Sequence, residues 1–120
     1  MKIDRFEDIQ AWEESKNLTN SIYEVCKGNL FFKDFGLKDQ IQRASVSIMA
    51  NIAEGFDSAS DIEFIKFLVY SRRSTSEVQS HLYVALDQKY ITKDTFNKLY
   101  QECKKVKSLI SGFIRYLKKT

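Results

Sequence analysis

The chain contains no proline and only four glycines among its 120 residues. These two residues break α-helices most strongly, because proline removes a backbone donor and glycine carries a high entropic cost in a helix. Alternating β-branched runs and turn pairs such as Asn-Gly, which are typical of β-hairpins, are also missing from the sequence. The sequence therefore predicts an all-α fold.

Hydrophobic periodicity divides the chain into four helical segments. A composition of 43% hydrophobic and 29% charged residues is typical of a folded protein, and the length fits a single domain over residues 1–120. Short connections between such helices predict an antiparallel up-down-up-down four-helix bundle. The expected helices run from about Glu7 to Lys27, from about Leu37 to Glu54, from the Ser60 N-cap to about Gln88, and from the Thr92 N-cap through Leu117.

Local signals support these boundaries. Glu7 and Asp8 suit the N-terminal end of the first helix dipole, and Gly55 is the expected stop of the second helix. Ser60 and Glu63 have the spacing of a capping box. Between the first two helices, an aromatic segment at residues 28–36 is expected to cross one end of the bundle and to plug its core with Phe31, Phe32 and Phe35.

Each helix has an apolar stripe that is expected to face the core. The predicted inner positions are Ile9, Trp12, Thr19, Ile22, Tyr23 and Cys26 in the first helix; Ile41, Ser45, Ile48 and Ile52 in the second; Phe64, Leu68, Ser71, Thr75, Val78, Leu82 and Ala85 in the third; and Phe96, Leu99, Cys103, Val106, Ile110, Phe113 and Leu117 in the fourth. Ser71 and Thr75 are small enough to let a neighbouring helix approach closely.

The second helix also carries a polar stripe. Arg43, Ser47, Asn51 and Glu54 recur at steps of four, four and three, so they share one helical face. A solvated face is usually richer in Lys and Glu. These side chains are instead suited to a fixed hydrogen-bond network against a neighbouring helix.

Enzymatic activity is not expected from this sequence. His81 is the only histidine, and no Gly-rich phosphate loop, Glu-x-x-His ligand pair or nucleophile elbow is present. Glu54 and Glu77 are the one conceivable acid–base pair, but Arg43, Arg72 and Arg73 are available to keep them ionised and structural. We therefore predict a protein without catalytic residues, metal or cofactor.

The two cysteines, Cys26 and Cys103, are far apart in sequence and are expected to be buried, reduced thiols. A disulfide between helices is the alternative if the chain is exported. No apolar leader segment precedes the first helix, and no run of eighteen apolar residues occurs. These features predict a cytoplasmic protein with no membrane partner.

Positive charge is concentrated in the last helix. Residues 1–92 carry 11 Lys/Arg against 14 Asp/Glu, whereas residues 93–120 carry 8 against 2. Such a basic helix fits the phosphates of RNA or DNA, and the alternative is a solvated face that keeps the protein soluble. The candidate nucleic-acid-binding residues are Lys98, Lys104, Lys105, Lys107, Arg115, Lys118 and Lys119, with a second small cluster at Arg72 and Arg73.

Two helices carry more apolar residues than one core stripe requires. The third helix adds Ile65, Phe67 and Val69, and the fourth adds Tyr100, Leu109, Ile114 and Tyr116. A helix that is apolar around most of its circumference must bury a second face. Self-association is therefore expected, unless these wide stripes are used within the bundle. A scaffold that binds proteins and never contacts nucleic acid is the alternative function.

Several segments together resemble a known protein family. FEDIQAWEESKNLTNSIYEV, FGLKDQIQRASVSIMANIAEGF, the SEV of STSEVQSHL and the closing amphipathic helix occur in the order found in four-helix-bundle proteins related to the 23S rRNA-intervening-sequence protein. The likeness covers nearly the whole chain, and QIQRASVSI-x-x-NIAEG is its most specific part. The family is also similar to the accessory protein of diversity-generating retroelements, a basic pentameric barrel that binds a reverse transcriptase and nucleic acid.

This resemblance implies a four-helix bundle that assembles as a cyclic homopentamer, and it implies no catalytic activity. The motif positions that correspond in this sequence are Arg43, Ser47, Asn51, Glu54, Gly55, Ser74 and Glu77. Ser74 and Glu77 thereby join the predicted polar network, which would connect the second and third helices within or between subunits.

Overall fold

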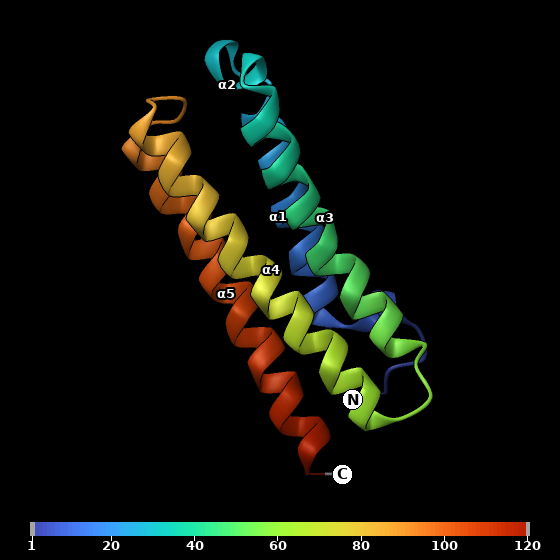
Figure 1. Ribbon diagram of the computed structural model, residues 1–120. Coiled ribbons are helices and arrows are strands. Elements are labelled where there is room, and N and C mark those ends of the chain that lie inside the picture. Colours follow the sequence, from blue (N-terminus) through green and yellow to red (C-terminus); the bar gives the residue numbers. More distant parts are fainter. Residues whose placement is uncertain (1, 120) are drawn as a thin grey trace.

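The computed structural model describes residues 2–119, which form helices and contain no strand (Figure 1). This architecture confirms the predicted all-α fold. In chain order, the elements are the short 3-10 helix η1 (Phe6–Asp8), α1 (Gln10–Val25), α2 (Asn29–Lys33), α3 (Phe35–Phe56), α4 (Asp61–Asp87) and α5 (Lys93–Lys118).

The four long helices run up, down, up and down along a molecule that measures 47 × 22 × 19 Å (Figure 1). Each packs against two neighbours: α3 lies against α1 and α4, and α5 lies against α4 and α1. The predicted antiparallel four-helix bundle is therefore confirmed. In this arrangement α4 and α5 form one side of the bundle, and α1 and α3 form the other.

Most of the predicted inner positions are buried. In α3 and α4 all of them are, and in α5 only Phe113 is half-buried, with Ile114 taking a core place beside it. The prediction for Tyr23 in α1 is wrong, because its side chain is 40% exposed. The buried stripe of α1 is centred on Ser15, Leu18 and Ile22, and Tyr23 lies about a quarter of a turn from it.

The first helix begins later than predicted. Glu7 and Asp8 belong to η1, and Ile9 interrupts the helix with an extended backbone at φ −80° and ψ 120°. Burial of the Ile9 side chain, which is 2% exposed, explains the break. The Asp8 carboxylate accepts a hydrogen bond from the backbone N–H of Asp4, so it stabilises the preceding turn and not the start of α1.

The second predicted helix, α3, is longer than expected at both ends. Asp34 caps it by accepting from the Leu37 N–H at 3.1 Å, so the helix starts at Phe35. It also continues through Gly55 to Phe56. Gly55 does not end the helix, because its role is to let α4 approach: a Cβ there would lie 2.7 Å from Phe64 Cδ1.

The predicted N-caps of the last two helices are present. Ser60 Oγ accepts from the Glu63 N–H at 3.2 Å, and Thr92 Oγ1 accepts from the Thr95 N–H at 3.1 Å. Both bonds satisfy backbone donors that the first helical turn leaves without a partner.

The end of α4 is a Schellman motif closed by Lys89. The Tyr90 N–H donates to the Ala85 carbonyl, the Lys89 N–H donates to the Leu86 carbonyl, and Lys89 has a φ of 64°. Glycine tolerates this left-handed conformation at lower cost. We expect Lys89→Gly to raise the free energy of unfolding in a urea titration by roughly 0.5–1 kcal/mol. Lys89→Ala keeps the steric cost and serves as the control; a glycine variant no more stable than the alanine variant would contradict this explanation.

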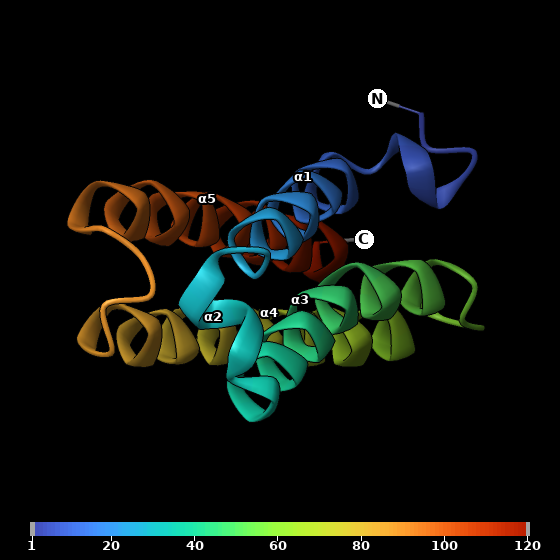
Figure 2. The ribbon, with the colours of Figure 1, turned by 90° about the horizontal axis from the view of Figure 1, so that it is seen from above.

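The α2 corner covers one end of the bundle, where it joins α1 to α3 (Figure 2). Phe31 is fully buried there and packs against Tyr90, with 5.3 Å between ring centroids. Phe32 and Phe35 are 53% and 68% exposed, so the prediction that all three phenylalanines plug the core is wrong for these two. The short α2 helix turns one ring inward and leaves its neighbours outside.

Cys26 and Cys103 are buried free thiols. Burial raises the pKa of Cys26 to about 11 and that of Cys103 to about 12. Because the thiolate is the reactive form, we expect both to react slowly with a chromogenic disulfide reagent at pH 8 in the native protein and rapidly in urea. Rapid reaction of the native protein would show that these helices open readily.

Of the helices in residues 2–119, none combines the length and apolar character that crossing a bilayer requires.

Candidate nucleic-acid interface

The α5 helix carries its cations away from the core. Its buried residues recur at steps of three and four, so they share one face, and apolar residues at the edges of that face leave the polar side chains on the outer surface. Lys107 is half-buried in this surface. The exposed cations of the helix are Lys93, Lys98, Lys104, Lys105, Arg115 and Lys118, and the exposed Lys119 follows directly after it.

On the side of α5 that faces α1, carboxylates offset the lysine charges. The Lys105 ammonium lies 3.4 Å from a Glu14 carboxylate oxygen on α1. Burial raises the pKa of Glu102, and the charge of nearby Lys98 acts in the opposite direction. An anionic ligand on this side would meet both carboxylates, so Lys98 and Lys105 are poorly placed to hold phosphates.

On the side that faces α4, cations meet neutral groups. Lys107 Nζ donates to Gln79 Oε1 at 3.2 Å, and Arg72 Nη1 on α4 donates to Ser111 Oγ on α5 at 3.1 Å. These bonds orient the two cations without neutralising them. Arg72 therefore joins the basic surface of α5 and does not form a separate cluster. Arg73 is exposed, but one step along α4 turns it about 100° from Arg72.

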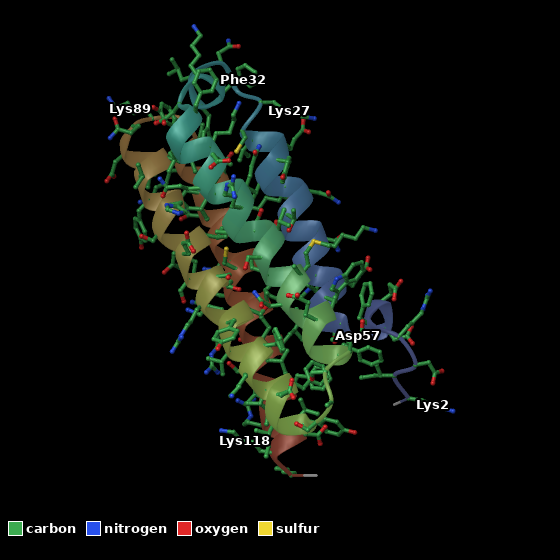
Figure 3. The ribbon with its side chains drawn as sticks, turned by 45° about the vertical axis from the view of Figure 1, so that its right-hand side comes forward. Lys2, Lys27, Phe32, Asp57, Lys89 and Lys118 are labelled. Carbon is green, nitrogen blue, oxygen red and sulfur yellow. The ribbon has the colours of Figure 1, made fainter. Side chains whose placement is uncertain are left out.

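Three exposed cations extend this side along α5. Lys104 and Arg115 are eleven residues apart, about three helical turns, so they point in nearly the same direction. Lys118 follows one turn after Arg115, near the end of the bundle that holds the chain termini (Figure 3). We call this surface the α4–α5 basic face, and it consists of Arg72, Lys104, Lys107, Arg115 and Lys118.

Three of the predicted network residues link α3 to α4. Ser74 Oγ donates to Ser47 Oγ at 3.0 Å. Asn51 Nδ2 donates to the same Ser47 Oγ at 3.0 Å and to the Ser47 carbonyl at 2.9 Å. All three residues are half-buried. This link lies within one chain and fixes the register of the two helices.

The charged members of the predicted network lie outside this link. Arg43 pairs with Asp39, one turn earlier on the same helix, at 2.9 Å. Glu77 lies 3.3 Å from His81 Nε2, and Glu54 is exposed with no ion-pair partner in residues 2–119. The predicted pairing of Glu54 and Glu77 with arginines is therefore wrong for the single chain: Arg43 pairs with Asp39, Arg72 donates to Ser111, and Arg73 forms no ion pair in residues 2–119.

Hydroxyl groups inside the bundle form contacts that sequence reasoning missed. Ser71 Oγ donates to the Ile48 carbonyl at 2.7 Å, and Thr19 Oγ1 donates to the Ser45 carbonyl at 3.1 Å. Both bonds connect neighbouring helices where small residues let the backbones approach. The only signal in the sequence was the presence of small hydroxyl residues on otherwise apolar stripes.

Hollows at the end that holds the termini offer little chemistry. One, of about 240 Å³, is lined mainly by apolar side chains that include Ile3, Leu109 and Phe113. A second, of about 320 Å³, shares Ile3 and Phe113 with it. Within residues 2–119, no group of three or more His, Cys, Asp and Glu side chains is arranged to hold a metal ion.

Comparison with known proteins identifies relatives by sequence and by fold. Residues 7–112 match the sequence model of the 23S rRNA-intervening sequence protein family. The fold is similar to the crystal structure of a protein of unknown function from the S23 ribosomal protein family of Bacteroides thetaiotaomicron. That likeness has a TM-score of 0.79 at 23% sequence identity and covers 87% of this chain and 97% of the other. Among curated proteins, none matches this chain.

Proposed function

This chain belongs to the family of 23S rRNA-intervening sequence proteins, and on that premise we propose that it binds RNA or DNA through the α4–α5 basic face. The observation that carries the proposal is the difference between the two sides of α5. Carboxylates offset the lysines that face α1, whereas Arg72 and Lys107 on the other side are held by neutral partners. The positive charge that is free to bind a phosphate backbone therefore lies on the side of α5 that faces α4.

Contacts of this kind act on phosphates and read little sequence. Lysine and arginine side chains along a helix release counterions when they neutralise phosphates, so affinity depends steeply on salt. The residues of this face lie along α5 and, for Arg72, on α4. None of them belongs to a strand or loop that could enter a groove of the nucleic acid. We expect similar affinity for RNA sequences of unrelated composition, and the proposal assigns the chain no catalytic role.

A titration of fluorescently labelled duplex RNA, followed by anisotropy at low salt, tests this proposal. Binding in the micromolar range is expected, with comparable affinity for two duplexes of unrelated sequence. Absence of binding at about 50 mM salt would contradict the proposal, because electrostatic contacts are strongest there. That result would favour the alternative of a scaffold that binds proteins only.

Self-association is the second part of the proposal, and exposed apolar side chains support it. Ile62, Tyr70 and Val84 on α4 are 75%, 47% and 43% exposed. The flanking residues noted in the sequence contribute less, because Ile65, Val69, Tyr100 and Leu109 pack partly against the chain's own core and Ile114 is buried. On α4 and α5, exposed apolar side chains therefore remain mainly on the outer side of α4, and Tyr116 of α5 is the exception at 58% exposed.

Exposed charged side chains on the neighbouring helix α3 could form ion pairs with another subunit. Glu54 is exposed without an ion pair in residues 2–119, and the Arg43–Asp39 pair is open to solvent. We propose that these groups meet their counterparts across a subunit interface in a homo-oligomer, with the pentamer as the expected form. Light scattering at micromolar concentration tests this assembly, and a monomeric mass would contradict it.

A further inference from the structure

The α2 corner presents an apolar surface at the end of the bundle away from the chain termini. Leu30, Phe32 and Phe35 are 59%, 53% and 68% exposed, although they lie within six residues of one another. Scattered exposed apolar residues are normal in soluble proteins, but a cluster of this kind at one end marks a contact surface. The α4–α5 basic face does not include this corner.

The fold holds these side chains outward. Phe31 is buried and packs on Tyr90, and the Tyr90 hydroxyl donates to Asp34 Oδ2 at 2.8 Å. Asp34 in turn caps α3 through its other carboxylate oxygen. The hydrogen bond from Tyr90 to Asp34 fixes the connection between α2 and α3 to the loop after α4. The rings of Phe32 and Phe35, on either side of Asp34, are therefore already exposed in the folded chain.

The two exposed rings share one cation. The Lys38 ammonium lies 4.0 Å from the centroid of the Phe32 ring and 5.1 Å from that of the Phe35 ring. Both ring faces are thus directed at a common point, which the chain fills with its own ammonium group. A flat aromatic group could replace the ammonium at this point and contact the same ring faces.

Lysines outnumber uncompensated carboxylates around the rings. Lys33 and Lys38 have no ion-pair partner in residues 2–119, and Lys89 lies at the same end of the bundle as Phe32 (Figure 3). Of the carboxylates in this segment, Asp39 pairs with Arg43, whereas Asp34 accepts from two neutral donors that leave its charge in place. One carboxylate therefore stands against three lysines. A partner that combines flat apolar groups with negative charge would match this surface.

We propose that Phe32 and Phe35 form a stacking site for unpaired bases of single-stranded nucleic acid. Bases stack on aromatic rings regardless of their identity, and lysines beside the rings contact the adjoining phosphates. On binding, the Lys38 ammonium leaves the rings for a phosphate, and a base takes its place. This inference deepens the proposed nucleic-acid binding, and it adds a preference for single strands that the α4–α5 basic face does not provide.

The test compares three labelled ligands of about twelve nucleotides: oligouridine, an abasic strand that keeps the phosphates, and a duplex. Wild-type protein is expected to bind oligouridine roughly tenfold to a hundredfold more tightly than the abasic strand. The double variant Phe32→Leu/Phe35→Leu keeps an apolar surface but cannot stack bases. It should lose this preference and retain wild-type affinity for the duplex. Tyr23→Leu, which removes an exposed ring from α1, is the matched control and should leave the preference unchanged.

The outcomes separate this inference from the proposed function. Equal affinity of wild-type protein for oligouridine and the abasic strand, or a preference that survives in the double leucine variant, would overturn the stacking site. Duplex binding would then still support the α4–α5 basic face. If the base preference is found but the duplex does not bind, the result counts against the α4–α5 basic face and not against the stacking site. A third outcome would favour a membrane contact and overturn the inference: wild type and the double leucine variant both cosediment with phosphatidylserine vesicles, and neither binds oligouridine more tightly than the abasic strand. Thermal unfolding of the double variant should match wild type, because both rings are exposed.

Discussion

Charge reversal of Lys104, Arg115 and Lys118 to glutamate is expected to lower the affinity for duplex RNA on the order of a hundredfold at low salt. The three side chains are exposed on the side of α5 that lies against α4, and none of them forms an ion pair within residues 2–119. Each substitution removes one phosphate contact and places a negative charge against the backbone of the ligand. Fluorescence anisotropy with labelled duplex RNA measures the loss.

A second triple variant controls for net charge. Lys16, Lys98 and Lys105 are exposed outside the α4–α5 basic face, and their replacement by glutamate changes the total charge by the same amount. We expect a decrease of less than about tenfold, because long-range charge effects are screened beyond about 10 Å in 0.1 M salt. Equal losses in the two variants would show that only net charge matters, and would remove the reason for placing the ligand beside α4.

Gly55→Val is expected to destabilise the fold by about 3 kcal/mol. Gly55 is a buried residue of α3 that packs directly against α4. A Cβ there would lie 2.7 Å from Phe64 Cδ1 and 2.9 Å from Phe67 Cβ, and the second atom cannot swing away because it is fixed to the backbone of α4. The two helices must therefore separate, which also strains the hydrogen bond between Ser47 and Ser74.

Urea unfolding followed by circular dichroism measures this effect. Gly112→Ala is the matched control, because Gly112 also lies within a helix but its added Cβ would meet only the Arg115 side chain at 3.7 Å. That variant is expected to gain roughly 0.5–1 kcal/mol from the higher helix propensity of alanine. An unchanged unfolding midpoint for Gly55→Val would mean that α3 and α4 are not in close contact at this point.

Much of the fold follows from local patterns, whereas its breaks follow from tertiary contacts. Every inner position that periodicity predicted in α4 is buried, and only the buried Gln79 was missed; the caps at Ser60 and Thr92 followed from side-chain chemistry. The start of α1 could not be predicted in this way. Glu7 and Asp8 suit a helix start, but the burial of Ile9 against the bundle interrupts the helix after them.

The sequence predicted which helix face carries the candidate interface. It could not predict which of its cations are offset by carboxylates. The heptad of α5 placed its lysines outward, as observed. It contained no information on the contact between Lys105 and Glu14, or on the hydrogen bond that brings Arg72 to Ser111, because both depend on how α1 and α4 pack on α5. The corner at Phe32 and Phe35 escaped prediction for a similar reason, since aromatic composition does not determine which ring of the segment is buried.

The most direct test of nucleic-acid binding by the α4–α5 basic face is the salt dependence of duplex RNA binding by wild-type protein and by the variant with glutamate at positions 104, 115 and 118. For each phosphate contact, the slope of log K against log salt concentration changes by about 0.9 for duplex DNA, and a similar value is expected for duplex RNA. Binding through the α4–α5 basic face should give a steep negative slope for wild type and a slope shallower by about 3 for the variant. Identical slopes for the two proteins, or an affinity that does not change with salt, would contradict it.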